Sequence, residues 1–250
     1  MKKCWAACLG DCSDKLSGEH IVTAGIFSSD KVKVQGLPWC RDAPKEIGLA
    51  SAVKNVLCTW HNSRLSPLDD AVIQVFGALR DAVRLSDVRS NLPLRRWTKA
   101  HFDVDGARLE RWCLKTLITL STGGSVPLGP HSNDAETPDE NLVGVCFGLA
   151  PFQAPKGLYV AWEVGDKMEI QDEKVVISTF LDDNRLAGAR FYLGGFVFIL
   201  YLNDRELKPG PLRFTRADGS VEQRPQPQYH NKAVNFQLGK YVSHCVRFIW

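Results

Sequence analysis

The sequence lacks an apolar run long enough to cross a membrane. Within its 250 residues the longest such run is Phe196–Leu202, whereas a membrane-spanning helix needs roughly 20 apolar residues. The opening residues, Met1–Cys8, resemble a lipoprotein signal only faintly, because polar residues follow a very short apolar stretch. We therefore expect a cytoplasmic protein that does not associate with membranes.

The sequence also lacks a strong charge and the common phosphate-binding loops. Its 31 Lys and Arg residues nearly balance 28 Asp and Glu residues, which leaves a net charge of +3. That charge is too mild to identify a nucleic-acid-binding protein by itself. No G-x-x-x-x-G-K-[ST] loop, no G-x-G-x-x-G after a strand and no G-x-S-x-G elbow is present. Nothing therefore indicates a P-loop, a dinucleotide-binding fold or a serine hydrolase.

Cysteine, by contrast, is plentiful and unevenly distributed. Five of the 8 cysteines fall within the first 70 residues, namely Cys4, Cys8, Cys12, Cys40 and Cys58. Eight cysteines could form disulfides, but a long chain without a secretion signal favours reduced cysteines. We therefore interpret these cysteines as thiols or as thiolate ligands of a metal.

Two short Cys/His pairs form one predicted zinc site. The first pair is Cys8-x3-Cys12 and the second is Cys58-x2-His61. Zinc prefers thiolate and imidazole ligands in a tetrahedron, and such spacings let both members of a pair reach one ion. Cys4 fits in place of Cys8, so the spacing leaves these two residues as alternatives. The competing interpretation is a set of buried thiols without a metal.

A carboxylate and a histidine lie side by side between the two pairs, at Glu19 and His20. A neutral imidazole can take a proton from water near pH 7, and a carboxylate-bound divalent metal can stabilise charge on a phosphate. Neighbouring residues of a regular strand point to opposite faces, so both side chains reach one site only if the strand bends. The alternative is a structural histidine beside a surface carboxylate.

The same residues resemble the HNH-type, or ββα-metal, endonucleases with a zinc-knuckle frame. The resemblance covers about residues 4–70, and it rests on the two pairs, on Leu16–Val22 and on Val56–Asn62. It implies that His20 is the general base and that Glu19 binds a catalytic Mg²⁺ or Mn²⁺. It also places Asn62 where the family has a further metal ligand, after the second half of the zinc site.

A basic region between residues 80 and 115 predicts a nucleic-acid contact. Candidate phosphate-binding residues are Arg95, Arg96, Lys99, Arg111 and Lys115. Trp97 lies among them and could stack on a base. The alternative is a solvated helical face with core tryptophans.

Apolar spacing predicts two helices in the middle of the chain. The first runs from Ala71 to about Leu85, with Ser66-Pro67, Asp69 or Asp70 as its start signal. The second runs from about Ala107 to Leu120. Asp69 or Asp70 could complete the metal-binding set. We favour the interpretation that both aspartates cap the first helix.

The second half of the chain has a different pattern. Residues 121–142 are polar and predict a long loop, and from Leu142 onward short β-rich runs are separated by Gly, Asp-Asn and Pro. The predicted strands are 143–149, 158–163, 174–180, 189–193, 196–202, 233–238 and 241–249. We expect an α+β protein with a zinc-binding HNH-like module at 1–85, a helical connection at 86–141 and an antiparallel β-rich domain at 142–250.

The expected function is metal-dependent cleavage of phosphodiester bonds in nucleic acid, DNA more than RNA, with a structural Zn²⁺. The family resemblance suggests bacterial genome defence as the setting. The β-rich half would bind a protein or ligand partner. The alternative is a non-catalytic, zinc-stabilised protein that binds nucleic acid or another protein.

Overall fold

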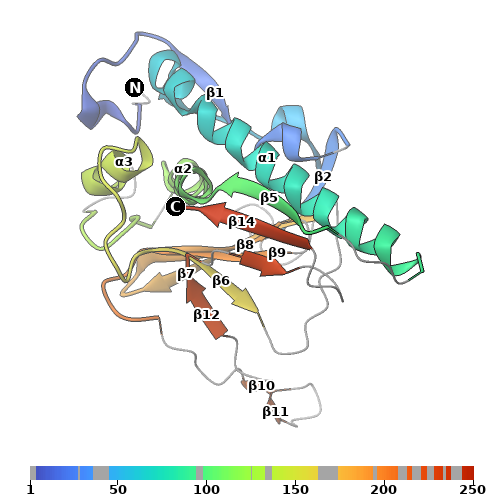
Figure 1. The fold of residues 1–250 in the computed structure, drawn as a ribbon. Helices are drawn as coiled ribbons and strands as arrows, with labels where there is room; N and C mark the ends of the chain where they lie inside the picture. The colour runs from blue at the N-terminus through green and yellow to red at the C-terminus, as the bar shows by residue number, and fades with distance from the viewer. Residues whose placement is uncertain are drawn as a thin grey trace.

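Helices lie above a large β-sheet, and one of them, α2, lies between α1 and that sheet (Figure 1). The computed structural model describes residues 4–27, 29–35, 45–93, 98–124, 126–132, 137–162, 174–193, 196–207, 213–215, 221–223, 228–232, 235–237 and 244–250. None of the helices in these ranges has the length and apolarity that a membrane crossing requires.

The helices and short turns have the following bounds. The α-helices are α1 (Thr59–Ser90), α2 (Gly106–Ser121) and α3 (Glu140–Cys146), and the 3₁₀ turns are η1 (Ala7–Leu9), η2 (Ala24–Ile26) and η3 (Leu49–Ser51). The strands of the first half are β1 (Leu16–His20), β2 (Lys31–Gln35), β3 (Lys45–Gly48), β4 (Val53–Cys58) and β5 (Ala100–Asp105). Those of the second half are β6 (Gly157–Trp162), β7 (Lys174–Asp182), β8 (Arg185–Leu193), β9 (Phe196–Tyr201), β10 (Arg213–Thr215), β11 (Val221–Gln223), β12 (Gln228–Asn231), β13 (Asn235–Gln237) and β14 (His244–Ile249).

The largest sheet has the strand order β12-β6-β9-β8-β7-β2-β3. Its C-terminal strands pair antiparallel, as the β-rich pattern predicts, whereas β2 joins β7 in parallel. A three-stranded sheet has the order β13-β14-β5, and β14 runs parallel to β5. The chain is therefore a mixed α/β protein with an antiparallel sheet in its C-terminal half.

A two-stranded antiparallel sheet and the helix that follows it form a small unit near the N-terminus. β1 pairs antiparallel with β4, and α1 begins directly after β4. The pairing is irregular between Ser17 and Glu19, so the strand bends where the sequence required a bend. This ββα arrangement places β1 and the first turns of α1 next to each other.

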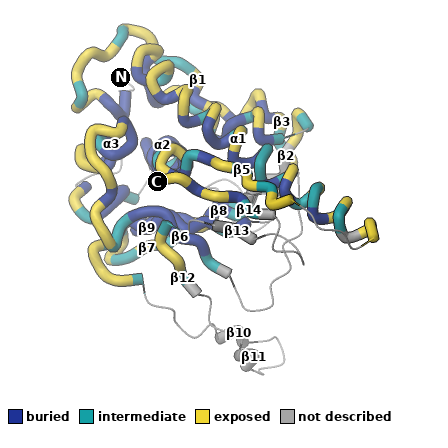
Figure 2. Tube along the Cα trace, viewed as in Figure 1, coloured by how far each residue is buried: buried dark blue, intermediate teal, exposed yellow. Residues whose placement is uncertain are grey.

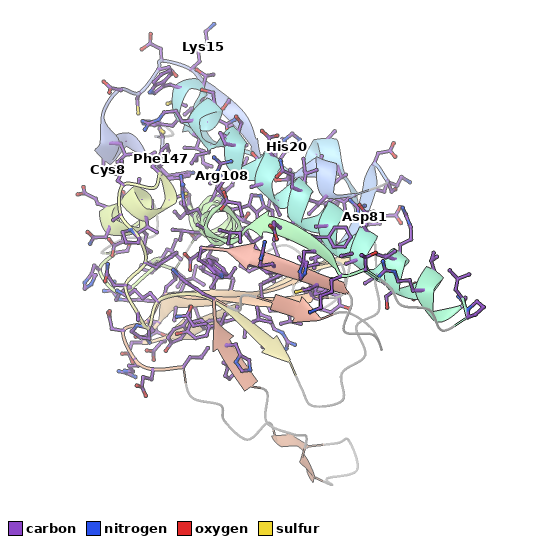
Figure 3. The ribbon with its side chains drawn as sticks, in the orientation of Figure 1. Cys8, Lys15, His20, Asp81, Arg108 and Phe147 are labelled. Atoms are coloured by element: carbon purple, nitrogen blue, oxygen red, sulfur yellow. The ribbon has the colours of Figure 1, made fainter. Side chains whose placement is uncertain are left out.

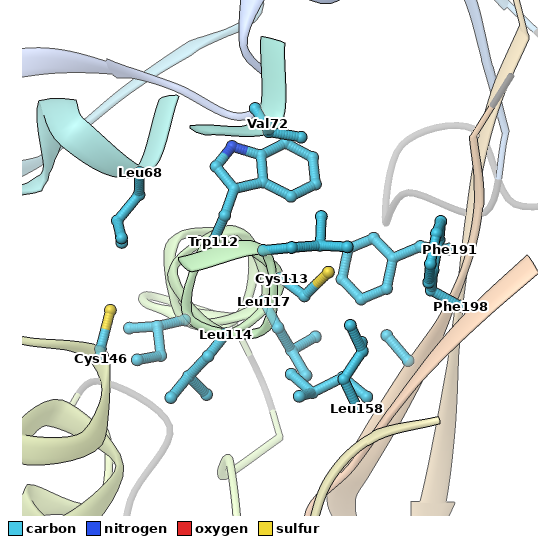
Figure 4. Close-up of a cluster of buried hydrophobic side chains, with 14 of the residues drawn as sticks. Leu68, Val72, Trp112, Cys113, Leu114, Leu117, Cys146, Leu158, Phe191 and Phe198 are labelled. Carbon is cyan, nitrogen blue, oxygen red and sulfur yellow. The ribbon is translucent and has the colours of Figure 1, made fainter. Parts of the chain in front are cut away.

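Helix α2 is the centre of the apolar core. It is buried along most of its length, and its buried residues include the polar side chains of Glu110, Lys115, Thr116 and Thr119. Trp112 points toward α1, while Cys113 and Leu117 lie on the side of the sheet residues Phe191 and Phe198 (Figure 4). The buried segments concentrate around this helix (Figure 2).

Helix α1 begins earlier than the sequence predicted, at Thr59 instead of about Ala71. The Cys58 thiol caps it by accepting a hydrogen bond from the His61 backbone. Pro67 leaves the carbonyl of Ser63 without its usual backbone donor, and the hydroxyl of Ser66 donates to that carbonyl at 2.9 Å instead. The helix therefore passes through Pro67, and the two aspartates are not caps.

The strand predicted at 143–149 does not form: residues 143–146 belong to helix α3, and residues 147–149 form the turn that follows it. Asp139 caps this helix by accepting from the backbone of Asn141, and Leu142, Val143 and Cys146 are buried. A short apolar run suits a buried strand and a buried helix equally, so the cap decided the outcome. The second helix, by contrast, was predicted within a residue of its ends.

The N-terminal and C-terminal segments share one core. A single cluster of buried apolar side chains extends from Cys4 to Phe248. In addition, β2 and β3 form one edge of the seven-stranded sheet beside β7. The division into units at 1–85, 86–141 and 142–250 stays a prediction.

Candidate metal centre and adjoining pocket

Four side chains from separate parts of the N-terminal region converge on one point. They are Cys4, Cys12, Cys58 and His61, whose ligand atoms all lie within 4.8 Å of one another. Cys4 lies before η1, Cys12 after it, and the other two on either side of the β4–α1 junction. Apart from Cys12, which is exposed, the four are buried. This group could hold a metal ion.

The distances within the group agree with a tetrahedral zinc site. Nδ1 of His61 lies 3.2 Å from the sulfur of Cys58, 3.4 Å from that of Cys4 and 3.6 Å from that of Cys12. Bond lengths of about 2.3 Å to sulfur and about 2.0 Å to nitrogen give tetrahedral S···N edges of about 3.5 Å. The donor set and its spacing therefore fit Zn²⁺.

The thiols differ in how readily they ionise. Burial alone would raise the pKa of Cys58, but hydrogen bonds from His61 and Ser13 outweigh it and lower the pKa to about 6. Desolvation raises the pKa of Cys12 to about 12, with further contributions from Cys4 and Cys58. A bound cation would remove the repulsion that opposes several thiolates at one point.

The structure brings together three of the four predicted zinc ligands and substitutes Cys4 for Cys8. Cys8 is exposed and does not belong to the group; Figure 3 shows it on the outer side of the N-terminal segment. The chain reverses direction at Gly10 and Asp11, both of which have positive φ. This reversal returns Cys12 to Cys4, which spacing alone does not show.

The end of α3 closes the metal centre. The ring of Phe147 packs edge-on against His61, with centroids 5.4 Å apart, and against Trp5 at 5.8 Å. The guanidinium of Arg64 lies 5.3 Å from the centre of the same ring. Nε2 of His61 is buried and has no hydrogen-bond partner among the described residues. Aromatic packing therefore holds the imidazole in place.

A pocket of about 470 Å³ lies beside this centre. It is lined by Ser17, Gly18, Glu19, His20, Thr23, Ala24, Gly25, Thr59, Asn62, Ser63, Ser66 and Asp69. The members from α1 recur at intervals of three and four and so share one face of that helix. The opposite face carries buried residues such as Leu65, Leu68 and Val72. The pocket is therefore built from β1, η2 with the residue before it, and one polar face of α1.

Glu19 and His20 both line the pocket, in different environments. Glu19 is 3% exposed, whereas His20 is exposed, and no described residue hydrogen-bonds to its imidazole. Figure 3 shows His20 near α1. The imidazole is therefore accessible to a ligand in the pocket.

The carboxylate of Glu19 belongs to a buried polar network. Nζ of Lys115 lies 2.5 Å from Oε1 of Glu19 and 2.8 Å from both carboxylate oxygens of Asp69. The Glu19 contact is an ion pair without good hydrogen-bond geometry. Thr23 donates to Asp69 at 2.5 Å and accepts from the Trp112 indole at 2.8 Å. Residues from β1, α1, α2 and the segment before η2 thus meet behind the pocket.

The network shifts the pKa values of its members. Burial lowers the pKa of Lys115, but attraction to Glu19 and Asp69 outweighs it and raises the pKa above the ordinary lysine value. Burial raises the pKa of Glu19, and Lys115 offsets part of that shift. The ammonium charge of Lys115 is therefore retained inside the protein.

Asn62 and the two aspartates have separate surroundings. The side-chain amide of Asn62 donates to the hydroxyl of Ser17 at 2.9 Å. Asp69 faces the pocket from the third turn of α1, whereas Asp70 is exposed. The interpretation of Asp69 as a helix cap is wrong, because α1 begins at Thr59 and Asp69 lies inside it.

The five predicted phosphate-binding residues do not form one described surface. Lys99 is exposed, Arg111 donates to the carbonyl of Cys146 at 2.9 Å, and Lys115 is 1% exposed. Arg95 and Arg96 lie outside the described residues. Lys115 therefore belongs to the interior of the protein. Its position in a basic stretch of sequence does not predict this burial.

No protein-family model, curated protein or solved structure matches the chain.

Proposed function

We propose that the protein cleaves phosphodiester bonds in nucleic acid, as an HNH-type endonuclease does, with His20 as the general base. The observation that carries this proposal is that His20, Asn62, Glu19 and Asp69 line one pocket beside the Cys/His centre. Glu19 and His20 lie at the end of β1 and Asn62 lies in the first turn of α1, in the order that the ββα resemblance implies.

The pocket offers suitable chemistry for such a reaction. An exposed imidazole can take a proton from a water molecule aimed at phosphorus. On the polar face of α1, the hydroxyl of Thr59 and the second amide hydrogen of Asn62 can donate hydrogen bonds to phosphate oxygens. His20 would hold the proton at an imidazole nitrogen until it passes to the leaving oxygen or to solvent.

The Cys/His centre would have a structural role. Four protein ligands close the coordination of zinc and leave no position for substrate. The centre joins the segment before β1 to the start of α1, so bound zinc would fix His20 relative to Asn62. A Zn²⁺ ion would thus order the pocket without entering it.

A catalytic Mg²⁺ or Mn²⁺ fits the described pocket less well. Among the described residues, the Cys/His centre alone brings three or more ligand atoms together, and Glu19 is already paired with Lys115. No step is therefore assigned to a second metal. DNA as the preferred substrate, a cytoplasmic setting and bacterial genome defence remain proposals based on the family resemblance.

The test is incubation of purified zinc-loaded protein with supercoiled plasmid, linear DNA and RNA. Each substrate is tested with Mg²⁺, with Mn²⁺ and without added metal. We expect cleavage by the native protein, loss of at least about 100-fold in His20→Ala, as for other general bases, and full activity in His101→Ala, an exposed histidine outside the pocket. Equal cleavage by His20→Ala would rule out the assigned base.

A second candidate function is non-catalytic binding of nucleic acid or protein. The engagement of Glu19 by Lys115 and of Asn62 by Ser17 favours it, because both side chains already have partners. Retained binding of DNA in a gel-shift assay, with no cleavage by the native protein under any metal condition, would select this alternative.

A further inference from the structure

Lys115 is the only charged residue of α2 that approaches the pocket carboxylates in the described structure. It does not itself line the pocket, but both of its partners, Glu19 and Asp69, do. The side chains of Lys115 and Glu19 are 2% and 4% exposed, and that of Asp69 is 27% exposed. The ammonium therefore lies behind two carboxylates that face the pocket.

The arrangement requires the cation. A buried carboxylate is costly unless a charge or hydrogen bonds compensate it, and two carboxylates close together repel each other. Here Glu19 comes from β1 and Asp69 from α1, and Lys115 from α2 contacts both. Two negative charges and one positive charge leave a net charge of −1 at the floor of the pocket.

We propose that Lys115 is a positioning residue for the hydrolysis: its ammonium holds Glu19 and Asp69 side by side at the pocket floor and balances one of their charges. This inference rests on the proposed function for its catalytic consequence. It concerns a lysine that lies 25 residues beyond the end of the ββα unit in sequence, on the helix that packs against the large sheet.

The proposal gives Lys115 two separable effects. The ammonium anchors Glu19, which precedes the proposed base His20 on β1, so its loss should displace that base and lower kcat more than it raises KM. It also repels any divalent cation from the floor of the pocket, so its loss should tighten cation binding there. A residue that serves only packing would show neither the second effect nor the split between kcat and KM.

The experiment compares Lys115→Met, Lys115→Arg and the native protein, all loaded with zinc. Electron paramagnetic resonance measures the binding of Mn²⁺. Cleavage assays measure kcat and KM on the nucleic acid that the native protein cleaves fastest. We expect Lys115→Met to bind Mn²⁺ at least about tenfold more tightly, which corresponds to about 1.4 kcal/mol, and to lose most of kcat. Lys115→Arg retains the charge, so it should keep the native Mn²⁺ affinity and recover part of kcat.

A double variant controls for folding. Glu19→Gln combined with Lys115→Met removes one negative and one positive charge, so it should fold and bind Mn²⁺ no more tightly than the native protein. If Lys115→Met fails to fold, a folded double variant supports the charge-balancing role, and a double variant that is equally unfolded overturns it. Circular dichroism and thermal melting provide the readout.

The outcomes distinguish this inference from the proposed function. Absence of cleavage by the native protein would reject the proposed function, and the Mn²⁺ affinities would then decide the charge-holding role of Lys115 alone. Unchanged Mn²⁺ affinity in a folded Lys115→Met variant would overturn the inference even if the native protein cleaves nucleic acid.

Discussion

The sulfur of Cys4 lies 3.4 Å from Nδ1 of His61, although 57 positions separate the two residues. This contact joins the first described residue of the chain to the first turn of α1. It also excludes Cys8 from the metal centre, since Cys12 and Cys58 supply the other ligand atoms. The identity of the fourth ligand can be tested directly.

Replacing Cys4 and Cys8 separately by serine distinguishes the two alternatives. We expect Cys4→Ser to lose bound zinc and several kcal/mol of stability, because zinc binding contributes directly to folding. Cys8→Ser, which alters an exposed thiol, should retain zinc and native stability. Elemental analysis measures the bound zinc of each variant, and thermal melting measures its stability. Zinc retained by Cys4→Ser but not by Cys8→Ser would contradict the geometry.

Removal of the Thr23 hydroxyl should destabilise the protein more than removal of the Thr116 hydroxyl. Thr23 bridges Asp69 and the indole of Trp112, so Thr23→Val leaves a buried indole N–H unpaired and should cost about 1–3 kcal/mol. Thr116 is buried, and its hydroxyl has no hydrogen-bond partner among the described residues. Thr116→Val should therefore be neutral or stabilising. Urea denaturation of the two variants measures their free energies of unfolding. An equal loss of stability in both variants would contradict this account.

Gly188 is required by the close approach of β8 to its neighbours. Its φ is 153°, and an added Cβ would lie 2.1 Å from the carbonyl oxygen of Leu200 and 2.4 Å from Phe180. We expect Gly188→Ala to destabilise the protein by about 2 kcal/mol or more.

Gly77 provides the matched control for that substitution. An added Cβ there meets nothing within 4 Å, and the residue lies inside α1. Gly77→Ala should stabilise the protein by about 0.5–1 kcal/mol through helix propensity. Chemical denaturation of both variants shows whether each substitution raises or lowers the free energy of unfolding. Stabilisation by Gly188→Ala would contradict the predicted clash.

Glu110 should make stability depend on pH. Burial raises its pKa, and the hydrogen bond from the Leu158 backbone and the charge of Lys232 offset only part of that shift. A raised carboxyl pKa contributes stability that is fully present below the unfolded pKa of about 4.3 and is lost as pH rises through the folded pKa. Glu110→Gln keeps the acceptor for Leu158 and removes this titration.

The measurement for Glu110 is the free energy of unfolding of both proteins between pH 4 and pH 8. Relative to the native protein, Glu110→Gln should gain stability as pH rises through that range. A constant difference across the range would show that the carboxyl titrates alike in the folded and unfolded protein.

The sequence indicated the parts of the metal centre because ligand chemistry is local. Thiolate and imidazole at short spacing favour zinc wherever they occur, and this predicted Cys12, Cys58 and His61. The choice between Cys4 and Cys8 depended on a chain reversal at Gly10 and Asp11. Both cysteines satisfy the same spacing, so only the path of the backbone separates them.

The elements of the fold were predictable to different degrees for similar reasons. The ends of α2 and the positions of β8 and β9 follow from apolar patterning and turn residues. The start of α1 could not be predicted in this way, because the residue that caps it is a cysteine and Pro67 lies inside the helix. The parallel pairing of β2 with β7 joins distant segments, and no local pattern specifies such a partner.

The sequence by itself determined which chemical groups the protein possesses: a zinc-type donor set, an acidic residue beside a histidine, and lysines and arginines in the middle of the chain. Only the tertiary structure decided where each acts. It placed Lys115 beside Glu19 and Asp69 in the interior instead of on a basic surface. The physical reason is that charge pairing depends on distance in space, and the packing of α2 between α1 and the sheet sets that distance.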